Sequence, residues 1–181
     1  MRLQFISISV ALALLPASAA QVNAREASGE NVYTSIGLWK IVKRQRGNGL
    51  RECSALMNDG VDILEIDYSP FSEHIYVGVS AWSGSRLVDG SIVPLTTKFS
   101  ATLGGAVEQV ETAAKITPVP SLPNAKLVWI GYKSPDQFLS GFAKARYISF
   151  HTMDQQLAML EVSDSAELVW QLKGCADSLL Q

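Results

Sequence analysis

The sequence is poor in the residues that usually mark a catalytic or metal site. Its 181 residues include only two histidines and two cysteines, and no CxxC pair, GxSxG nucleophile motif or glycine-rich phosphate loop occurs. The carboxylates nearest to His74 and His151 are Glu73 and Asp154, which stand at no recognised metal-ligand spacing. We therefore expect no metal and no cofactor, and we assign no catalytic residue.

Long apolar runs are missing everywhere except at the N-terminus. Arg2 is followed by an apolar run from Phe5 to Leu15, and then by Pro16 and small residues. This run is too short for a membrane-spanning helix, which needs about 20 residues, but it is typical of a secretory signal peptide. We predict a signal peptide over residues 1–20, with cleavage possibly as late as residue 24. The mature protein is then periplasmic or secreted and has no transmembrane segment.

A basic excess is also missing. The chain has 15 basic and 17 acidic residues, and removal of residues 1–20 takes away Arg2 and no acid, which leaves 14 and 17 and a net charge near −3. Proteins that bind nucleic acid in general obtain much of their affinity by neutralising phosphates. The composition therefore argues against nucleic acid as a partner.

The two cysteines, Cys53 and Cys175, lie near opposite ends of the mature chain. In an oxidising compartment an even pair indicates one disulfide bond. In the chain-entropy description, closing a loop of this length stabilises the fold by roughly 4–5 kcal/mol. We expect the bond to be structural.

Turn signals and period-two alternation predict strands over most of the chain. Residues 21–36 are expected to form a flexible mature N-terminus, followed by a single β-rich domain over 37–181. The turn at Gly47-Asn48-Gly49 predicts a hairpin. The clearest strand is 74–82, with Ile75, Val77 and other apolar residues on one face. The other expected strands are 38–43, 52–57, 61–67, 92–103, 127–132, 147–152 and 157–162, and the total is eight or nine.

Two helices are expected in the C-terminal third. Ser134 and Pro135 mark a helix start, and a second helix begins near 163–165 and carries Leu168, Leu172 and Cys175 on one stripe. The three prolines in 115–126 predict an extended loop without regular pairing. The fold class is thus α+β, mostly antiparallel β, as a curved sheet, sandwich or half-barrel with two short C-terminal helices.

The stretch from Gln137 to Cys175, with a helix, a strand pair, a helix beginning at Ser165-Ala166 and a final cysteine, resembles the ending of small exported proteobacterial proteins of the invasion-associated locus B type. The resemblance implies an envelope or secreted protein of mostly β fold. It transfers no catalytic residue to this chain.

Several surfaces are candidates for partner contacts. Trp82 stands at a strand end beside the 83–90 loop, and the 117–124 segment is rich in proline. Trp129 and Trp170 have apolar neighbours and are expected in the core. Cations gather around the first hairpin and could contact an anionic surface, such as lipid head groups or a polyanionic sugar; they are Lys40, Lys43, Arg44, Arg46 and Arg51.

Glu65 and Asp67 share one face of a predicted strand, and we expect that face to be solvated rather than to form a glycosidase pair. The function favoured by these features is a non-catalytic envelope module that binds a protein or an envelope polymer. An inhibitor of a lysozyme or protease is the first alternative. A hydrolase centred on His74 or His151 is the second.

Overall fold

The structure is a computed structural model that describes residues 31–58, 62–82, 87–105, 107–118 and 125–181. The predicted signal peptide, the first part of the 83–90 loop and most of the proline-rich 117–124 segment lie outside these residues.

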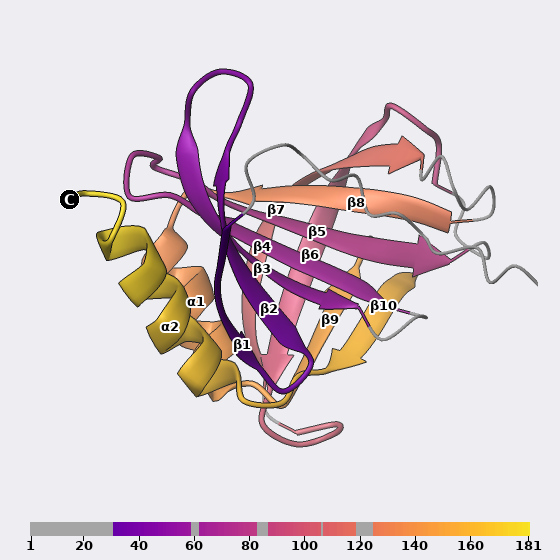
Figure 1. The fold of residues 1–181 in the computed structure, drawn as a ribbon. Helices are drawn as coiled ribbons and strands as arrows, with labels where there is room; N and C mark the ends of the chain where they lie inside the picture. The colour runs from indigo at the N-terminus through magenta and orange to yellow at the C-terminus, as the bar shows by residue number, and fades with distance from the viewer. Residues whose placement is uncertain (1–30, 59–61, 83–86, 106, 119–124) are drawn as a thin grey trace, which may run out of the picture.

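Ten strands and two helices follow one another along the described chain (Figure 1). In order they are β1 (Asn31–Ile36), β2 (Trp39–Gln45), β3 (Arg51–Asn58), β4 (Ile63–Tyr68), β5 (Ile75–Trp82), β6 (Ile92–Ser100), β7 (Val107–Pro118), β8 (Ala125–Tyr132), α1 (Pro135–Lys144), β9 (Tyr147–His151), β10 (Gln156–Glu161) and α2 (Ser165–Asp177). The predicted α+β fold, mostly antiparallel β with two C-terminal helices, is confirmed.

All ten strands belong to one antiparallel sheet that does not close on itself. The spatial order is β1-β2-β3-β4-β5-β8-β7-β6-β9-β10, so β1–β5 form a meander and the chain then crosses over. β5 pairs with β8 along its whole length, from Ile75 opposite Tyr132 to Trp82 opposite Ala125. This pairing joins the N-terminal and C-terminal parts of the sheet.

Period-two alternation gives the sheet two different faces. In β5, Ile75, Val77 and Val79 are fully buried, as predicted, and point toward the helices. We call this side the inner face and the opposite side the outer face. Tyr76 and Gly78 lie on the outer face of the same strand.

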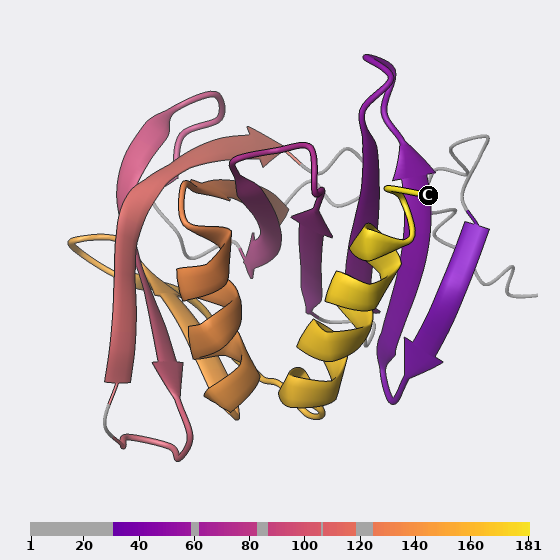
Figure 2. The ribbon, with the colours of Figure 1, turned by 90° about the vertical axis from the view of Figure 1, so that its left-hand side faces the viewer.

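The two helices cover the inner face. Figure 2 shows α1 and α2 side by side, with β1–β3 on one flank and β6–β7 on the other. α1 begins after Ser134 with Pro135 at its first position, as predicted, and its Phe142 ring meets Trp39 of β2 edge to face at 5.9 Å. Within the described residues, neither helix has the length and apolar character needed to cross a lipid bilayer.

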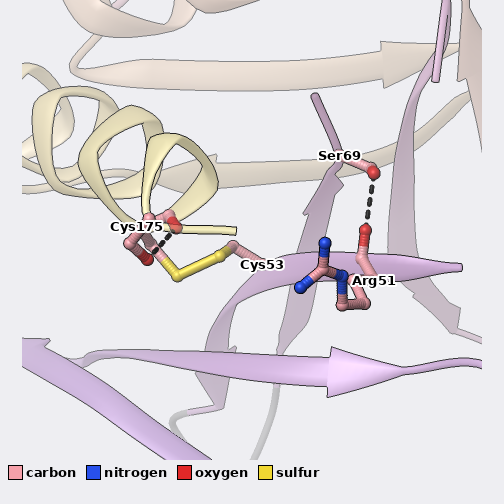
Figure 3. The surroundings of a disulfide bond; sticks show 5 residues. Arg51, Cys53, Ser69 and Cys175 are labelled. Carbon is pink, nitrogen blue, oxygen red and sulfur yellow. Dashed lines mark hydrogen bonds between the residues drawn. A yellow bond between two sulfur atoms is a disulfide. The ribbon is translucent and has the colours of Figure 1, made fainter. Parts of the chain in front are cut away.

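A disulfide bond ties α2 to β3. Cys53 and Cys175 are joined and fully buried, which confirms the predicted pair (Figure 3). Cys175 lies on the apolar stripe of α2 with Leu168 and Leu172, all three buried. On the β3 side, the hydroxyl of Ser69 donates a hydrogen bond of 2.6 Å to the carbonyl of Arg51. The C-terminal helix is therefore covalently fixed to the N-terminal meander.

Two parts of the fold differ from the expectations. Residues 31–36 lie in the segment expected to be flexible, but they form β1, because their backbone pairs with β2 and Tyr33 packs under Lys43. The loop expected over 115–126 was wrong at both ends: β7 continues to Pro118 and β8 begins at Ala125. Proline has no N–H, so at the last residue of β7 it removes at most one donor from the end of the ladder.

Candidate functional site

The outer face of β2–β4 carries a compact group of ionised side chains. Nε of Arg46 donates to both carboxylate oxygens of Glu52 at 2.7 Å, and Nη2 of Arg46 donates to Oδ2 of Asp67 at 2.7 Å. Nη1 of Arg44 donates to Oε1 of Glu65. We call these five residues the outer-face charge cluster.

Strand register brings the cluster together. Arg44 of β2 lies opposite Glu52 of β3, and the next strand supplies Glu65 and Asp67, two residues apart and therefore on the same face. Arg46 follows the end of β2 and turns back over the sheet. Three strands thus contribute to one site on the outer face.

The cluster has more carboxylates than guanidinium groups, and its carboxylates are poorly hydrated. Asp67 exposes only 2% of its surface and Glu52 only 3%. Burial, followed by the neighbouring Asp67 carboxylate, raises the pKa of Glu65 to about 7, although Arg44 opposes the shift. Burial and Asp67 also raise the pKa of Glu52. The site therefore takes up a proton close to neutral pH.

Two polar atoms in this region make no hydrogen bond to the described residues. They are Oδ1 of Asp67 and Oγ of Ser54, which are both buried and belong to residues directly opposite each other in β4 and β3. A buried polar atom without a partner is costly and rare in proteins. The interior of the cluster therefore keeps unused hydrogen-bonding capacity.

These contacts correct the expected solvated face of Glu65 and Asp67. Both carboxylates are instead covered, because Arg44 and Arg46 reach across from the neighbouring hairpin. The sequence could not show this pairing, since each arginine is 21 positions from its β4 partner.

The five cations around the first hairpin do not form one surface. Strand alternation places Lys40 and Arg44 on the outer face, whereas Lys43 and Arg51 lie on the inner side. Nζ of Lys43 stands 5.5 Å from the centre of the Tyr33 ring, and the Arg51 guanidinium stands 5.3 Å from that of Phe71. Contact with an anionic surface stays a prediction.

Two aromatic rings lie next to the charge cluster, each close over a glycine of the opposite strand. A Cβ at Gly78 would lie 3.0, 3.1 and 3.2 Å from three consecutive ring carbons of Trp129. A Cβ at Gly131 would lie 3.4 and 3.6 Å from two ring carbons of Tyr76. Gly78 is directly opposite Trp129, and Tyr76 is directly opposite Gly131, so the two contacts are reciprocal. We call these four residues the aromatic face.

The aromatic face and the charge cluster are in contact. The guanidinium carbon of Arg46 lies 5.7 Å from the centre of the Tyr76 ring, within cation–π range. Tyr76 is also opposite Asp67 in the β4–β5 ladder, and 37% of its surface is exposed. Together they make a continuous site of rings, guanidinium groups and carboxylates.

The aromatic face was not predicted from the sequence, although a signal was present. Glycine in the interior of a strand often marks a close approach of another group. Gly78 and Gly131 are both in strand interiors, each next to or near an aromatic residue. Trp129 was expected in the core, but it is half-buried on the outer face over Gly78.

The two histidines lie in different surroundings. His74 stacks on Tyr76, with ring centres 6.1 Å apart and planes 21° apart. Nε2 of His151 lies 2.8 Å from Oγ of Ser149 on the same strand face, and burial, then Lys98, lowers the pKa of His151. In the described part of the chain no carboxylate hydrogen-bonds either ring. The catalytic arrangement expected of a histidine-dependent hydrolase is thus incomplete among these residues.

The tryptophans also differ from expectation. Trp39, not Trp170, is in the core; Trp39 is 1% exposed and Trp170 is 68% exposed on α2. Trp82 is the last residue of β5, and its side chain lies outside what the structure describes. Trp170 is exposed because it is two residues from Leu168, which points it away from the apolar stripe of the helix.

No group of three or more histidine, cysteine, aspartate or glutamate residues that could hold a metal ion occurs among the described residues. Comparison of the whole chain with protein-family models, with curated proteins and with solved structures finds no match.

Proposed function

We propose that this chain is an exported, non-catalytic binding protein, and that its outer face holds a neutral polysaccharide of the cell envelope. The observation that carries the proposal is the pair of rings, Tyr76 and Trp129, each lying over a glycine of the opposite strand beside the outer-face charge cluster. The predicted signal peptide and the Cys53–Cys175 bond support export. The resemblance of residues 137–175 to proteins of the invasion-associated locus B type points in the same direction.

Saccharides match both halves of this site. One side of a sugar ring is lined by C–H bonds and packs against the flat side of an aromatic ring, whereas its hydroxyls both donate and accept hydrogen bonds. Arg46 is a donor whose side chain is 41% exposed, and Glu65 is an acceptor beside it. A mixed set of rings, donors and acceptors is what a polyhydroxylated ligand requires.

The charge of the site favours a neutral polymer over an anionic one. Three carboxylates face two guanidinium groups, so the cluster with all carboxylates ionised has one excess negative charge. The mature chain is acidic as well. Because Glu65 is partly protonated near neutral pH, and because Lys40 and Lys115 lie on the same face, the charges are close to balance and offer a polyanion no strong attraction.

Binding suits the geometry better than hydrolysis. Glycosidases place two carboxyl groups on opposite sides of the bond that they cleave. Glu65 and Asp67 instead lie on the same side of a single strand, and Asp67 is too deeply buried to reach a substrate. The two carboxylates are engaged by arginines that hold the site together.

The test uses the mature chain and three neutral hexasaccharides: chitohexaose, cellohexaose and laminarihexaose. We expect at least one to bind by titration calorimetry, and Tyr76→Ala to weaken that binding about tenfold, the effect typical of a central aromatic contact. Trp170→Ala is the matched control, since Trp170 is exposed on α2 rather than on the outer face, and it should leave the affinity unchanged. Absence of binding to all three, or equal effects of the two variants, overturns the proposal.

A further inference from the structure

Within the described part of the chain, the far edge of β1 is an unpaired strand edge. β1 ends the sheet order, and among the residues that the structure describes only β2 pairs with it. Ile36 and Trp39 flank a two-residue turn and close the hairpin, so alternation directs the backbone N–H and C=O of Ser35 away from β2. Ser35 therefore offers a main-chain donor and acceptor on this side.

This edge carries one feature that protects natural edge strands, the bulge at Tyr33, but it lacks the charged side chains and proline that commonly block an edge. Natural edges are commonly blocked by charged side chains or proline. β1 reads NVYTSI and contains neither, whereas the opposite edge strand β10 carries Glu161. A bulge at Tyr33 is the only irregularity in the β1–β2 pairing. Its effect is to turn the Tyr33 ring toward α2.

Exposed apolar side chains adjoin the edge. Val32 is 59% exposed and Tyr33 is 39% exposed, and Trp170 on α2 is 68% exposed. A Cβ at Gly174 would lie 3.5 Å from the Tyr33 hydroxyl, and Trp170 is one helical turn before Gly174. The β1 edge and the exposed side of α2 thus form one surface, which we call the edge surface.

We propose that an extended segment of another protein adds to the sheet along β1 and packs an apolar side chain against Tyr33 and Trp170. Unpaired backbone donors and acceptors select a strand rather than a helix as the occupant, since only an extended chain can satisfy them. Because β1 has no charge, the segment needs no complementary charge opposite it. A second copy of this chain fits less well, because pairing β1 with itself would bring two bulges together.

This surface is separate from the saccharide site. The edge surface involves β1 and α2, whereas the aromatic face involves β5 and β8. The two proposals are therefore independent. A Tyr76→Ala variant should bind extended peptides at the edge surface as tightly as wild type does.

The test selects ligands from a phage-displayed library of random dodecapeptides on the mature wild-type chain. We expect enriched peptides with alternating apolar residues, whose affinity falls about tenfold in Ser35→Pro, which lacks the outward N–H, and stays within about twofold in Ser35→Ala, which keeps it. Trp170→Ala should weaken the same peptides about fivefold. Circular dichroism and a thermal melt establish that each variant is folded.

A second measurement does not depend on the proline variant. Hydrogen exchange of the wild-type amide of Ser35 should slow when a selected peptide is bound. The proposal is overturned if no peptide is enriched, if exchange at Ser35 is unchanged, or if folded Ser35→Pro binds as tightly as wild type. A wild-type dimer that Ser35→Pro converts to a monomer would also overturn it, since the occupant would then be a second copy.

Discussion

Nη2 of Arg46 lies 2.7 Å from Oδ2 of Asp67, and this contact supplies positive charge to a carboxylate that is almost fully buried. Arg46→Ala removes the charge and also removes the Nε–H that both carboxylate oxygens of Glu52 share. We expect the free energy of unfolding in urea to fall by roughly 2 kcal/mol, since breaking a buried pair strands a charge. Arg146→Ala is the matched control because its ion pair with Glu161 is at the surface. Similar losses in both variants would contradict this account.

Stability should depend on pH through Glu65. Its pKa is about 7 in the folded protein and lies near the ordinary value of 4.5 when the chain is unfolded, so the folded state holds the extra proton between these values. The contribution of Glu65 to stability is therefore complete below the lower value and is lost as pH rises to the upper one. Relative to wild type, Glu65→Gln should become more stable by roughly 1–2 kcal/mol between pH 5 and pH 8 in urea titrations.

Glu111→Gln is the control for this pH series, because Glu111 is exposed on β7. A stability difference between Glu65→Gln and wild type that stays constant from pH 5 to pH 8 would contradict the raised pKa of Glu65.

Loss of the disulfide should lower stability strongly. The bond closes a loop with a sequence separation of 122 residues between two fully buried positions. The variant with both Cys53→Ala and Cys175→Ala should lose roughly 4 kcal/mol of unfolding free energy in urea, mainly through the greater freedom of its unfolded chain. A loss below about 1 kcal/mol would mean that α2 is held almost entirely by its apolar stripe.

The Trp129 ring should be displaced by a single methyl group. A Cβ at Gly78 would lie 3.0 Å from the ring, which is closer than carbon atoms approach without a shift. Gly78→Ala should destabilise the protein by roughly 1–2 kcal/mol and weaken saccharide binding. Gly47→Ala is the control, since a Cβ there meets nothing within 4 Å. If Gly78→Ala keeps the stability and the saccharide affinity of wild type, the close contact between Gly78 and the Trp129 ring is contradicted.

Replacement of Trp39 by alanine should lower the free energy of unfolding far more than replacement of Trp170. Trp39 is 1% exposed and packs on Phe142, so its loss should cost roughly 3–5 kcal/mol. Trp170 is 68% exposed and should change the unfolding free energy by less than about 0.5 kcal/mol. Thermal melts of the two variants compare them directly. A clear loss of stability in Trp170→Ala would show that the Trp170 ring is packed against other side chains, contrary to this prediction.

Local sequence signals predicted the parts of the fold that depend on neighbouring residues. The Gly47-Asn48-Gly49 turn joins β2 to β3, and Pro135 begins α1. Period-two alternation identified β5, and the helical stripe through Leu168 oriented Cys175 toward the core. In each case the physical preference acts within a few residues, so one segment of sequence was enough.

The parts that were missed depend on contacts between distant segments. β7 has an inner face of Val110, Thr112, Ala114 and Ile116, which is too small and mixed to stand out as an apolar pattern. Glu65 and Asp67 look like solvated residues until Arg44 and Arg46 are folded over them. Trp170 shows the reverse error, because its apolar character suggested burial although its spacing from Leu168 did not.

The position of the sulfur bridge also sets an order of events during synthesis. Cys53 emerges 122 residues ahead of Cys175, so its thiol must wait until nearly the whole described domain has followed it. A chain released before α2 contains Cys53 alone and cannot complete the bridge. Formation of this bond therefore reports that the chain has been made as far as α2 and that α2 has met β3.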